Sequence, residues 1–135
     1  MFILTGLAFL FTAGLHFGAA QVNNCARNYT VHLGDTCDEI SATQNSSTYQ
    51  LATVNTNIDT GCTNLALGEV LCLGITGQDC TNTYAIVSGD NCEAIAAAEG
   101  TTYDVLLANN PNVDSTCANI YPGEVLCVAP EDVYV

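Results

Sequence analysis

The spacing of eight cysteines is the feature that most constrains this chain. The second four follow the first four at one constant offset of 55 residues, and no gap is needed to align them. The segment 68–72, Gly-Glu-Val-Leu-Cys, recurs at 123–127 with the same offset. Self-similarity of this kind indicates one structural unit used twice. The first set is Cys25, Cys37, Cys62 and Cys72, and the second is Cys80, Cys92, Cys117 and Cys127.

The repeat predicts two small domains, at 25–75 and 80–130, joined by a linker at 76–79 and followed by a tail at 131–135. Domains of about 50 residues bury little apolar surface and usually need cross-links. Four cysteines in each therefore predict two disulfides per domain, each contributing about 2–4 kcal/mol. Three pairings are open within each domain. A thiolate metal site is disfavoured because close Cys-x-x-Cys pairs are missing, so we expect neither metal nor cofactor.

Residues 1–20 are predicted to be a signal peptide. The segment 1–17 is almost wholly apolar, and the small residues at 18–20 suit cleavage after Ala20. A membrane anchor is the alternative, but the apolar run is short for a span and contains polar residues. We therefore expect a secreted, extracellular protein that does not associate with membranes.

The charge balance narrows the range of partners. The sequence has 14 acidic residues and one basic residue, Arg27, with a formal net charge of −13. Nucleic acids and anionic lipids attract Lys-rich and Arg-rich surfaces, so both are excluded as partners. A neutral or cationic partner suits this surface.

Each repeat predicts the order strand, helix, helix, strand, an α+β fold with a two-stranded antiparallel sheet and helices on one face. Cap-and-partner spacings mark the first helices at Thr36 with Glu39 and Asp90 with Glu93, and the second helices at Ser47 with Gln50 and Thr101 with Asp104. Alternation predicts that Leu71, Leu73, Leu126 and Val128 point inward. The expected elements are 29–32, 36–43, 48–54 and 70–73, then 84–87, 91–98, 102–109 and 125–128.

Three motifs of the second repeat, taken together, resemble a LysM domain. They are Tyr-x-Ile-x-x-Gly-Asp-x-Cys at 84–92, Leu-Leu-Ala-Asn-Asn-Pro-Asn-Val-Asp at 106–114, and Ile-Tyr-Pro-Gly-Glu-Val-Leu-Cys-Val at 120–128. The cysteine positions resemble the fungal secreted form of that family. The first repeat departs from the pattern, with Thr56 where the family favours Pro and Ala66-Leu67 in place of Tyr121-Pro122. The second repeat has Asn91 in place of the usual Thr.

This resemblance implies binding of glycans that contain N-acetylglucosamine, mainly chitin and peptidoglycan fragments. An N-acetyl group offers an amide donor, a carbonyl acceptor and a methyl, which loop amides and an apolar side chain can match. In the family the groove lies between the turn before the first helix and the loop after the second. Carried onto this chain, the groove residues are Gly34, Asp35, Thr36, Asn55, Thr56, Asn57 and Ile58, then Gly89, Asp90, Asn91, Asn110, Pro111, Asn112 and Val113.

Simpler roles compete with ligand contact at these positions. Asp35 and Asp90 also suit helix capping, and Asn-x-Asn loops are ordinary turn chemistry. Because Thr56 departs from the family, we expect the first domain to be the weaker site. No serine or cysteine has a partner base and the carboxylates are scattered, so we expect no enzyme.

The resemblance implies sequestration of chitin fragments from host receptors, or shielding of a fungal wall from chitinases. Two sites also allow avidity and a ligand-induced dimer. The alternatives are a protein target, and chitosan, whose cationic chain would meet acidic loops. Two sequons, at Asn28 and Asn45, predict N-glycosylation.

Overall fold

A computed structural model describes residues 22–134 of the 135-residue chain. The predicted signal peptide lies outside the described residues. Two βααβ units follow each other along the chain, as the repeat predicts, and each contains a two-stranded antiparallel sheet. The α+β prediction is therefore confirmed. We call residues 25–75 the first domain and residues 80–130 the second domain.

The helices and strands lie close to their predicted positions, and the strand lengths differ most. The first domain has β1 (Cys25–Thr30), α1 (Cys37–Gln44), α2 (Thr48–Val54) and β2 (Val70–Ile75). The second has β3 (Thr83–Ala85), α3 (Cys92–Glu99), α4 (Tyr103–Asn109) and β4 (Val125–Cys127). In the first domain β1 begins before its predicted start and β2 continues past its predicted end. In the second domain both strands are shorter than predicted. β1 pairs with β2, and β3 pairs with β4.

Two of the four predicted helix caps are displaced by one residue. Thr36 and Ser47 cap α1 and α2, as predicted, by accepting from the amides of Glu39 and Gln50. In the second domain the caps are Asn91 and Thr102 rather than Asp90 and Thr101. The Thr101 hydroxyl instead donates to the carbonyl of Ala129 at 3.2 Å. Both predicted caps therefore lie one residue before the side chains that perform the capping.

The disulfides settle the pairing that the sequence left open. In each domain the first cysteine pairs with the fourth and the second with the third. The outer bridge joins β1 to β2 in the first domain, and in the second it joins the segment before β3 to β4. The inner bridge ties the start of the first helix to the loop after the second helix. The bonds are Cys25–Cys72, Cys37–Cys62, Cys80–Cys127 and Cys92–Cys117.

Each domain has its own apolar core between its sheet and its helices. The inward positions predicted by alternation are confirmed, since Leu71, Leu73, Leu126 and Val128 are all buried. Burying one such side chain contributes about 1.5–3 kcal/mol. Branched and aliphatic side chains from the helices complete the cores, chiefly Ile40 and Leu51 in the first domain and Ile95 and Leu106 in the second.

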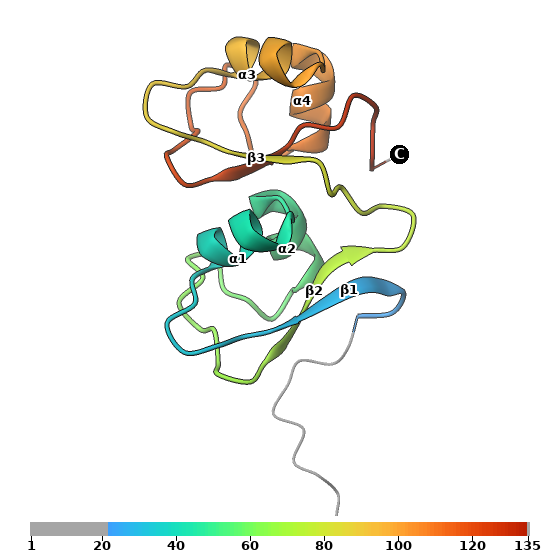
Figure 1. Cartoon of the computed structure of the whole chain (residues 1–135), viewed down its shortest axis with the longest axis vertical. Coiled ribbons are helices and arrows are strands. Elements are labelled where there is room, and N and C mark those ends of the chain that lie inside the picture. Colours follow the sequence, from blue (N-terminus) through green and yellow to red (C-terminus); the bar gives the residue numbers. More distant parts are fainter. Residues whose placement is uncertain (1–21, 135) are drawn as a thin grey trace, which may run out of the picture.

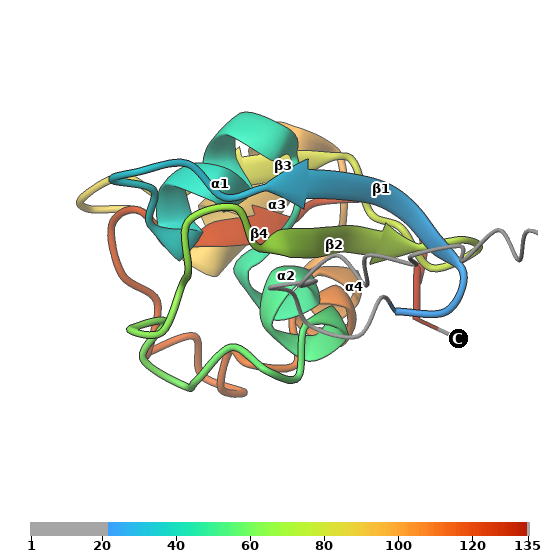
Figure 2. The same cartoon turned by 90° about the horizontal axis from the view of Figure 1, so that it is seen from below.

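The two domains stack head to tail. Figure 1 shows four successive layers: α3 and α4, then the β3–β4 sheet, then α1 and α2, then the β1–β2 sheet. The view from below in Figure 2 agrees, with the β1–β2 sheet foremost and the second domain behind it. The helices of the first domain thus cover the face of the β3–β4 sheet that its own helices leave free. This arrangement explains the surroundings of Val125, which is buried and whose amide donates to the Thr48 hydroxyl at 2.9 Å.

A polar network around Gln50 holds the linker and the tail against the first domain. Arg27 makes two 2.8 Å contacts with the carboxylate of Asp79 and donates to the Gln44 carbonyl at 2.6 Å. The Gln50 amide donates to Asp79 at 2.8 Å and accepts from the Tyr134 hydroxyl at 2.6 Å. A charged pair with such additional partners has its charges well satisfied.

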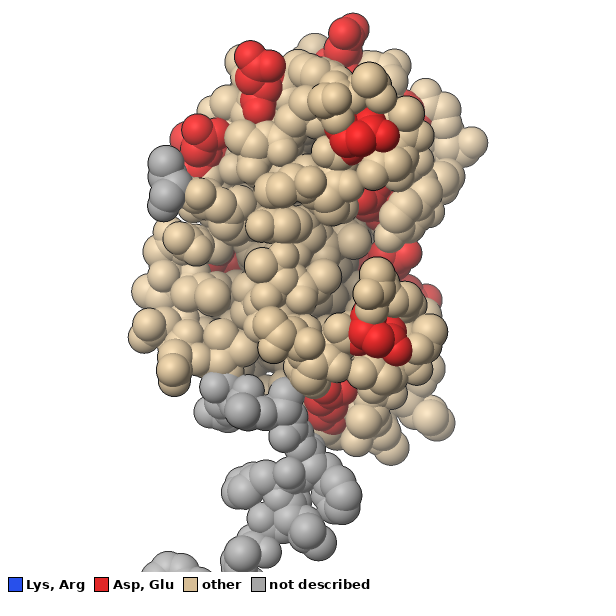
Figure 3. All heavy atoms as spheres, turned by 180° about the vertical axis from the view of Figure 1, so that it is seen from behind, with Lys and Arg blue, Asp and Glu red and all other residues tan. Residues whose placement is uncertain are grey.

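This network uses the one basic side chain that the sequence contains, other than its histidines. The space-filling view from behind in Figure 3 accordingly shows acidic groups scattered among neutral ones, with no Lys or Arg in view. Within residues 22–134, no helix has both the length and the apolar character needed to cross a bilayer.

Candidate functional site

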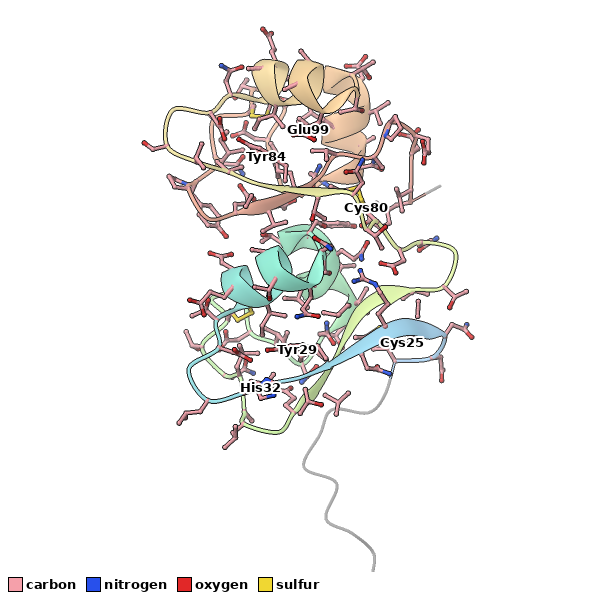
Figure 4. The ribbon with its side chains drawn as sticks, in the orientation of Figure 1. Cys25, Tyr29, His32, Cys80, Tyr84 and Glu99 are labelled. Carbon is pink, nitrogen blue, oxygen red and sulfur yellow. A yellow bond between two sulfur atoms is a disulfide. The ribbon has the colours of Figure 1, made fainter. Side chains whose placement is uncertain are left out.

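The Gly-Asp turns before α1 and α3 are built the same way. One carboxylate oxygen of Asp35 accepts from the Tyr29 hydroxyl at 2.7 Å and from the His32 amide at 2.8 Å. Asp90 repeats this, with Tyr84 at 2.7 Å and the amide of Val87 at 2.9 Å. Figure 4 shows Tyr29 and Tyr84 at matching places, each between the first strand and the helices of its domain. The aspartates therefore close the turns, and they do not cap the helices.

The hydrogen bonds of this turn also set its electrostatics. The Tyr29 hydroxyl, with the His32 amide second, lowers the pKa of Asp35 below its ordinary value, because both donors favour the carboxylate. The glycines that precede the aspartates have φ of 87° at Gly34 and 91° at Gly89, a region that side chains with a Cβ rarely adopt. The turn therefore depends on a glycine at this position and on the paired carboxylate that follows it.

The asparagines that open the loops after α2 and α4 have their side chains engaged inside the fold. Asn55 is buried, donates to the carbonyls of Leu51 and Cys72, and accepts from the Cys72 amide at 2.8 Å. Asn110 makes the equivalent three bonds to Leu106 and Cys127. These side chains tie each loop to its sheet, which leaves the loop backbone and the later residues as the parts able to meet a ligand.

Of the next residues in these loops, some are hydrogen-bonded within the fold and others are exposed to solvent. Asn57 donates to the carboxylate of Glu69, and Asn112 donates to Glu124 at 2.8 Å. Thr56 and Pro111 are exposed. Ile58 is half-buried and Val113 is only 8% exposed, so the first domain offers the more accessible apolar side chain.

A groove of about 310 Å³ lies in the first domain between the starts of α1 and α2 and the loop 58–62. This volume is at the lower end of the range for small-molecule sites, roughly 300–1,000 Å³. Of the predicted residues, Thr36 and Ile58 line it. The other five do not: Gly34, Asp35, Asn55, Thr56 and Asn57. Its other walls include Asp38, Ser41, Thr48, Ala52, Asp59 and Tyr121.

The equivalent groove of the second domain has a smaller volume. It measures about 260 Å³ and is lined by the helix starts and by the 92–117 disulfide, so that Asn91 is its only wall among the predicted residues. Tyr103 stands where the first domain has Thr48, and its hydroxyl donates to the Ser115 carbonyl at 3.0 Å across the groove. Leu107 stands where the first domain has Ala52. Tyr103 thus lines the second groove where Thr48 lines the first, whereas Leu107 packs, partly buried, against the core of the second domain.

Reasoning from the sequence missed most wall residues of the first groove, among them Ser41, Thr48, Asp59 and Tyr121. Three of them differ from their repeat partners, which are Ala96, Tyr103 and Ala66. A difference between otherwise matched repeats was therefore the signal available. Hydroxyls, carboxylates and apolar carbons line the groove without a cation, which suits a neutral polar ligand. Among the described residues no group of three His, Cys, Asp or Glu side chains is placed to hold a metal.

Fold and groove together define a class of protein: small disulfide-bonded βααβ modules, used in tandem, with a groove beside the start of the first helix. The family model for the LysM domain matches residues 29–74 and 84–129. The chain therefore belongs to the LysM domain family, and the resemblance seen in the sequence is confirmed.

Three relatives with LysM effector names come from fungi. The chain is 30% identical over 138 residues to the secreted LysM effector ldpA of Aspergillus fumigatus, a match that covers 80% of this chain and 36% of that protein. It is 35% identical over 107 residues to a secreted LysM effector of Pochonia chlamydosporia, covering 78% of this chain and 15% of that protein. A non-secreted LysM effector of Gibberella moniliformis is 31% identical, covering 78% and 14%. The chain thus spans well under half the length of these relatives.

Among solved structures, the chain is similar to the spore cortex-lytic enzyme SleL of Bacillus megaterium. The TM-score is 0.40 and the identity 21%, with 80% of this chain and 23% of that chain covered. Similarity at this level supports no inference about the activity of the present chain.

Proposed function

We propose that this protein is a secreted, non-catalytic lectin that binds chitin or shorter oligomers of N-acetylglucosamine. Membership of the LysM family supports a glycan ligand, and the relatives named as secreted effectors support export. One structural observation supports the proposal most directly, the open groove of the first domain. It combines polar groups from α1 and α2 with the accessible apolar side chain of Ile58, a combination that suits an N-acetyl group.

The first domain is the better candidate site in this proposal, although the sequence favoured the second. The second domain matches the family motif more closely at Pro111, but its groove is smaller and Tyr103 is one of its walls. We therefore expect one strong site per chain. In an organism, such a site would sequester chitin fragments from host receptors or coat a fungal wall against chitinases.

Calorimetric titration of the oxidised protein with chitin oligomers of increasing length tests the proposal. We expect saturable binding of one oligomer per chain, and no binding of cellulose oligomers, which lack the N-acetyl group. Ala52→Leu should weaken binding at least tenfold because it enlarges a wall residue of the first groove to the leucine found at the repeat partner. Leu107→Ala is the matched control and should leave the affinity of the first groove within about twofold.

Two outcomes of this titration would contradict the proposal. If folded protein gives no heat with any chitin oligomer, the ligand is not chitin, and a protein target becomes the working hypothesis. Stronger binding of chitosan oligomers, abolished by salt, would instead show that Asp38 and Asp59 select a cationic polymer, since interactions between exposed charges are screened within about 10 Å at 0.1 M salt.

A further inference from the structure

The second domain contributes a side chain to the groove of the first. Tyr121 belongs to the turn before β4, yet it lines the first groove beside the starts of α1 and α2. Its hydroxyl donates to the carboxylate of Asp38 at 3.1 Å. The ring is held at the groove by this bond and by the stacking of the β3–β4 sheet on α1 and α2, while 42% of the residue stays exposed.

The first domain has no equivalent aromatic group of its own at this position. The repeat partner of Tyr121 is Ala66, in the segment before β2. Among the described residues, no domain packs against the outer face of the β1–β2 sheet (Figure 1). The groove is therefore built from three segments of one domain and one tyrosine of the other.

We propose that Tyr121 is a ligand-contacting wall of the first groove, so that the first domain reaches its full affinity for glycan only with the second domain docked on it. This inference rests on the proposed function and specifies how the site is completed. An aromatic ring on a groove wall can pack against the apolar face of a sugar ring, and its edge and hydroxyl can meet polar groups. The sequence contains no tryptophan that could serve this purpose.

A second observation points to a ligand in the same groove. Ser41 lines it and is 1% exposed, and its hydroxyl has no hydrogen-bond partner among the described residues. Buried hydroxyls are normally paired, so an unpaired one at the floor of a groove marks a place where a polar group can bind. The second domain has Ala96 at the equivalent position, in the groove that Tyr103 crosses.

The molecule supplies a matched control for Tyr121. Tyr134 is also a tyrosine from beyond the linker whose hydroxyl bonds to the first domain, at 2.6 Å from Gln50. It packs edge-on against Tyr49 and lies outside the first groove. Burial raises the pKa of both tyrosines to about 12, so both stay neutral at the pH of a binding assay. Replacing either one removes a hydrogen bond between the first domain and a segment beyond the linker, but only Tyr121 lines the groove.

Titration of chitin hexamer into four variants tests the proposal, with folding of each verified by urea denaturation. We expect Tyr121→Ala to raise the Kd at least tenfold and Tyr121→Phe to raise it twofold to fivefold. Tyr134→Ala and Tyr134→Phe should stay within about twofold of the wild type. Unchanged affinity in Tyr121→Ala, or an equal loss in Tyr134→Ala, would overturn the proposal.

An NMR titration of the unaltered protein, with its tyrosine rings labelled, covers the case in which Tyr121→Ala does not fold. The Tyr121 ring signals should shift on addition of hexamer while those of Tyr134 stay in place, and the reverse pattern would contradict the proposal. Absence of binding by the wild type would refute the proposed function. Binding by the wild type with an indifferent Tyr121 would refute only this inference.

Discussion

Val70 and Val125 occupy the same position in the repeat, at the start of the second strand of each domain, and their surroundings are opposite. Val70 is 37% exposed, whereas Val125 is 1% exposed because α1 and α2 of the first domain cover its face of the sheet. The grooves differ as well, since the small residues Thr48 and Ala52 line the first groove, whereas Tyr103 stands in the place of Thr48 in the second. Two copies of one sequence pattern have thus diverged: the first domain has an open groove, and the second packs its sheet on the helices of the first.

The largest difference in stability between the two domains should come from Arg27, a basic residue that has no counterpart in the second domain. Arg27→Asn gives the first domain the residue found at its repeat partner, Asn82, and leaves the carboxylate of Asp79, 15% exposed, without its charged partner. We expect a loss of about 2–4 kcal/mol in the free energy of unfolding, measured with urea. Asn82→Ala is the control and should cost about 0.5 kcal/mol or less. A loss that small for Arg27→Asn would show that the network is not important for stability.

A smaller loss of stability should distinguish substitution of Val125 from substitution of Val70. Val125→Ala removes two buried methyl groups from the contact between the domains and should cost about 2 kcal/mol. Val70→Ala alters an exposed position and should cost about 0.5 kcal/mol or less. Thermal and urea unfolding of the pair measures the difference. Equal losses would mean that the two domains do not dock in solution as they do in the structure.

The smallest effect should be a different response of the two domains to acid. Donors lower the pKa of Asp35 and Asp59 in the first domain and of Asp114 in the second. Each such carboxyl adds stability above its unfolded value, near pH 4, and this contribution is lost as the pH falls through the folded value. Burial raises the pKa of Glu124, so its contribution has the opposite sign: present at low pH and lost as the pH rises.

We therefore expect the first domain to lose protection before the second between pH 5 and pH 2, as measured by amide hydrogen exchange. The variant Glu124→Gln removes the opposing contribution and should bring the two domains closer together in their acid response. Earlier opening of the second domain in the wild type would contradict this ordering.

Most of the fold could be predicted from the sequence because its signals are local. The strand alternation around Leu71 and Leu126, the cap spacing at Thr36 and Ser47, and the one-to-one cysteine repeat each specify nearby backbone. The cap at Asn91 was missed because Asp90 has the preferred spacing too, and only the hydroxyl of Tyr84 decides that this carboxylate closes the turn.

The candidate site was less predictable because it depends on contacts between distant residues. The family pattern indicates the turn and the loop, and these do flank the groove at Thr36 and Ile58. Asn55 and Asn110 look like ligand groups in the sequence, but their bonds to the neighbouring strands emerge only when the chain is folded. Tyr121 reaches the groove through the stacking of the domains, a relation between segments 83 residues apart.

The engagement of Arg27 has a consequence for resistance to proteolysis. Proteases of the trypsin type cleave after Lys or Arg, and this sequence offers them a single such position. That residue lies within β1, is paired to β2, sits two residues from a disulfide-bonded cysteine and has its guanidinium occupied by Asp79. Cleavage needs an accessible, extended segment free to enter the protease, which is typical of loop tips rather than paired strands. The folded protein should therefore be nearly inert to this class of digestive enzyme.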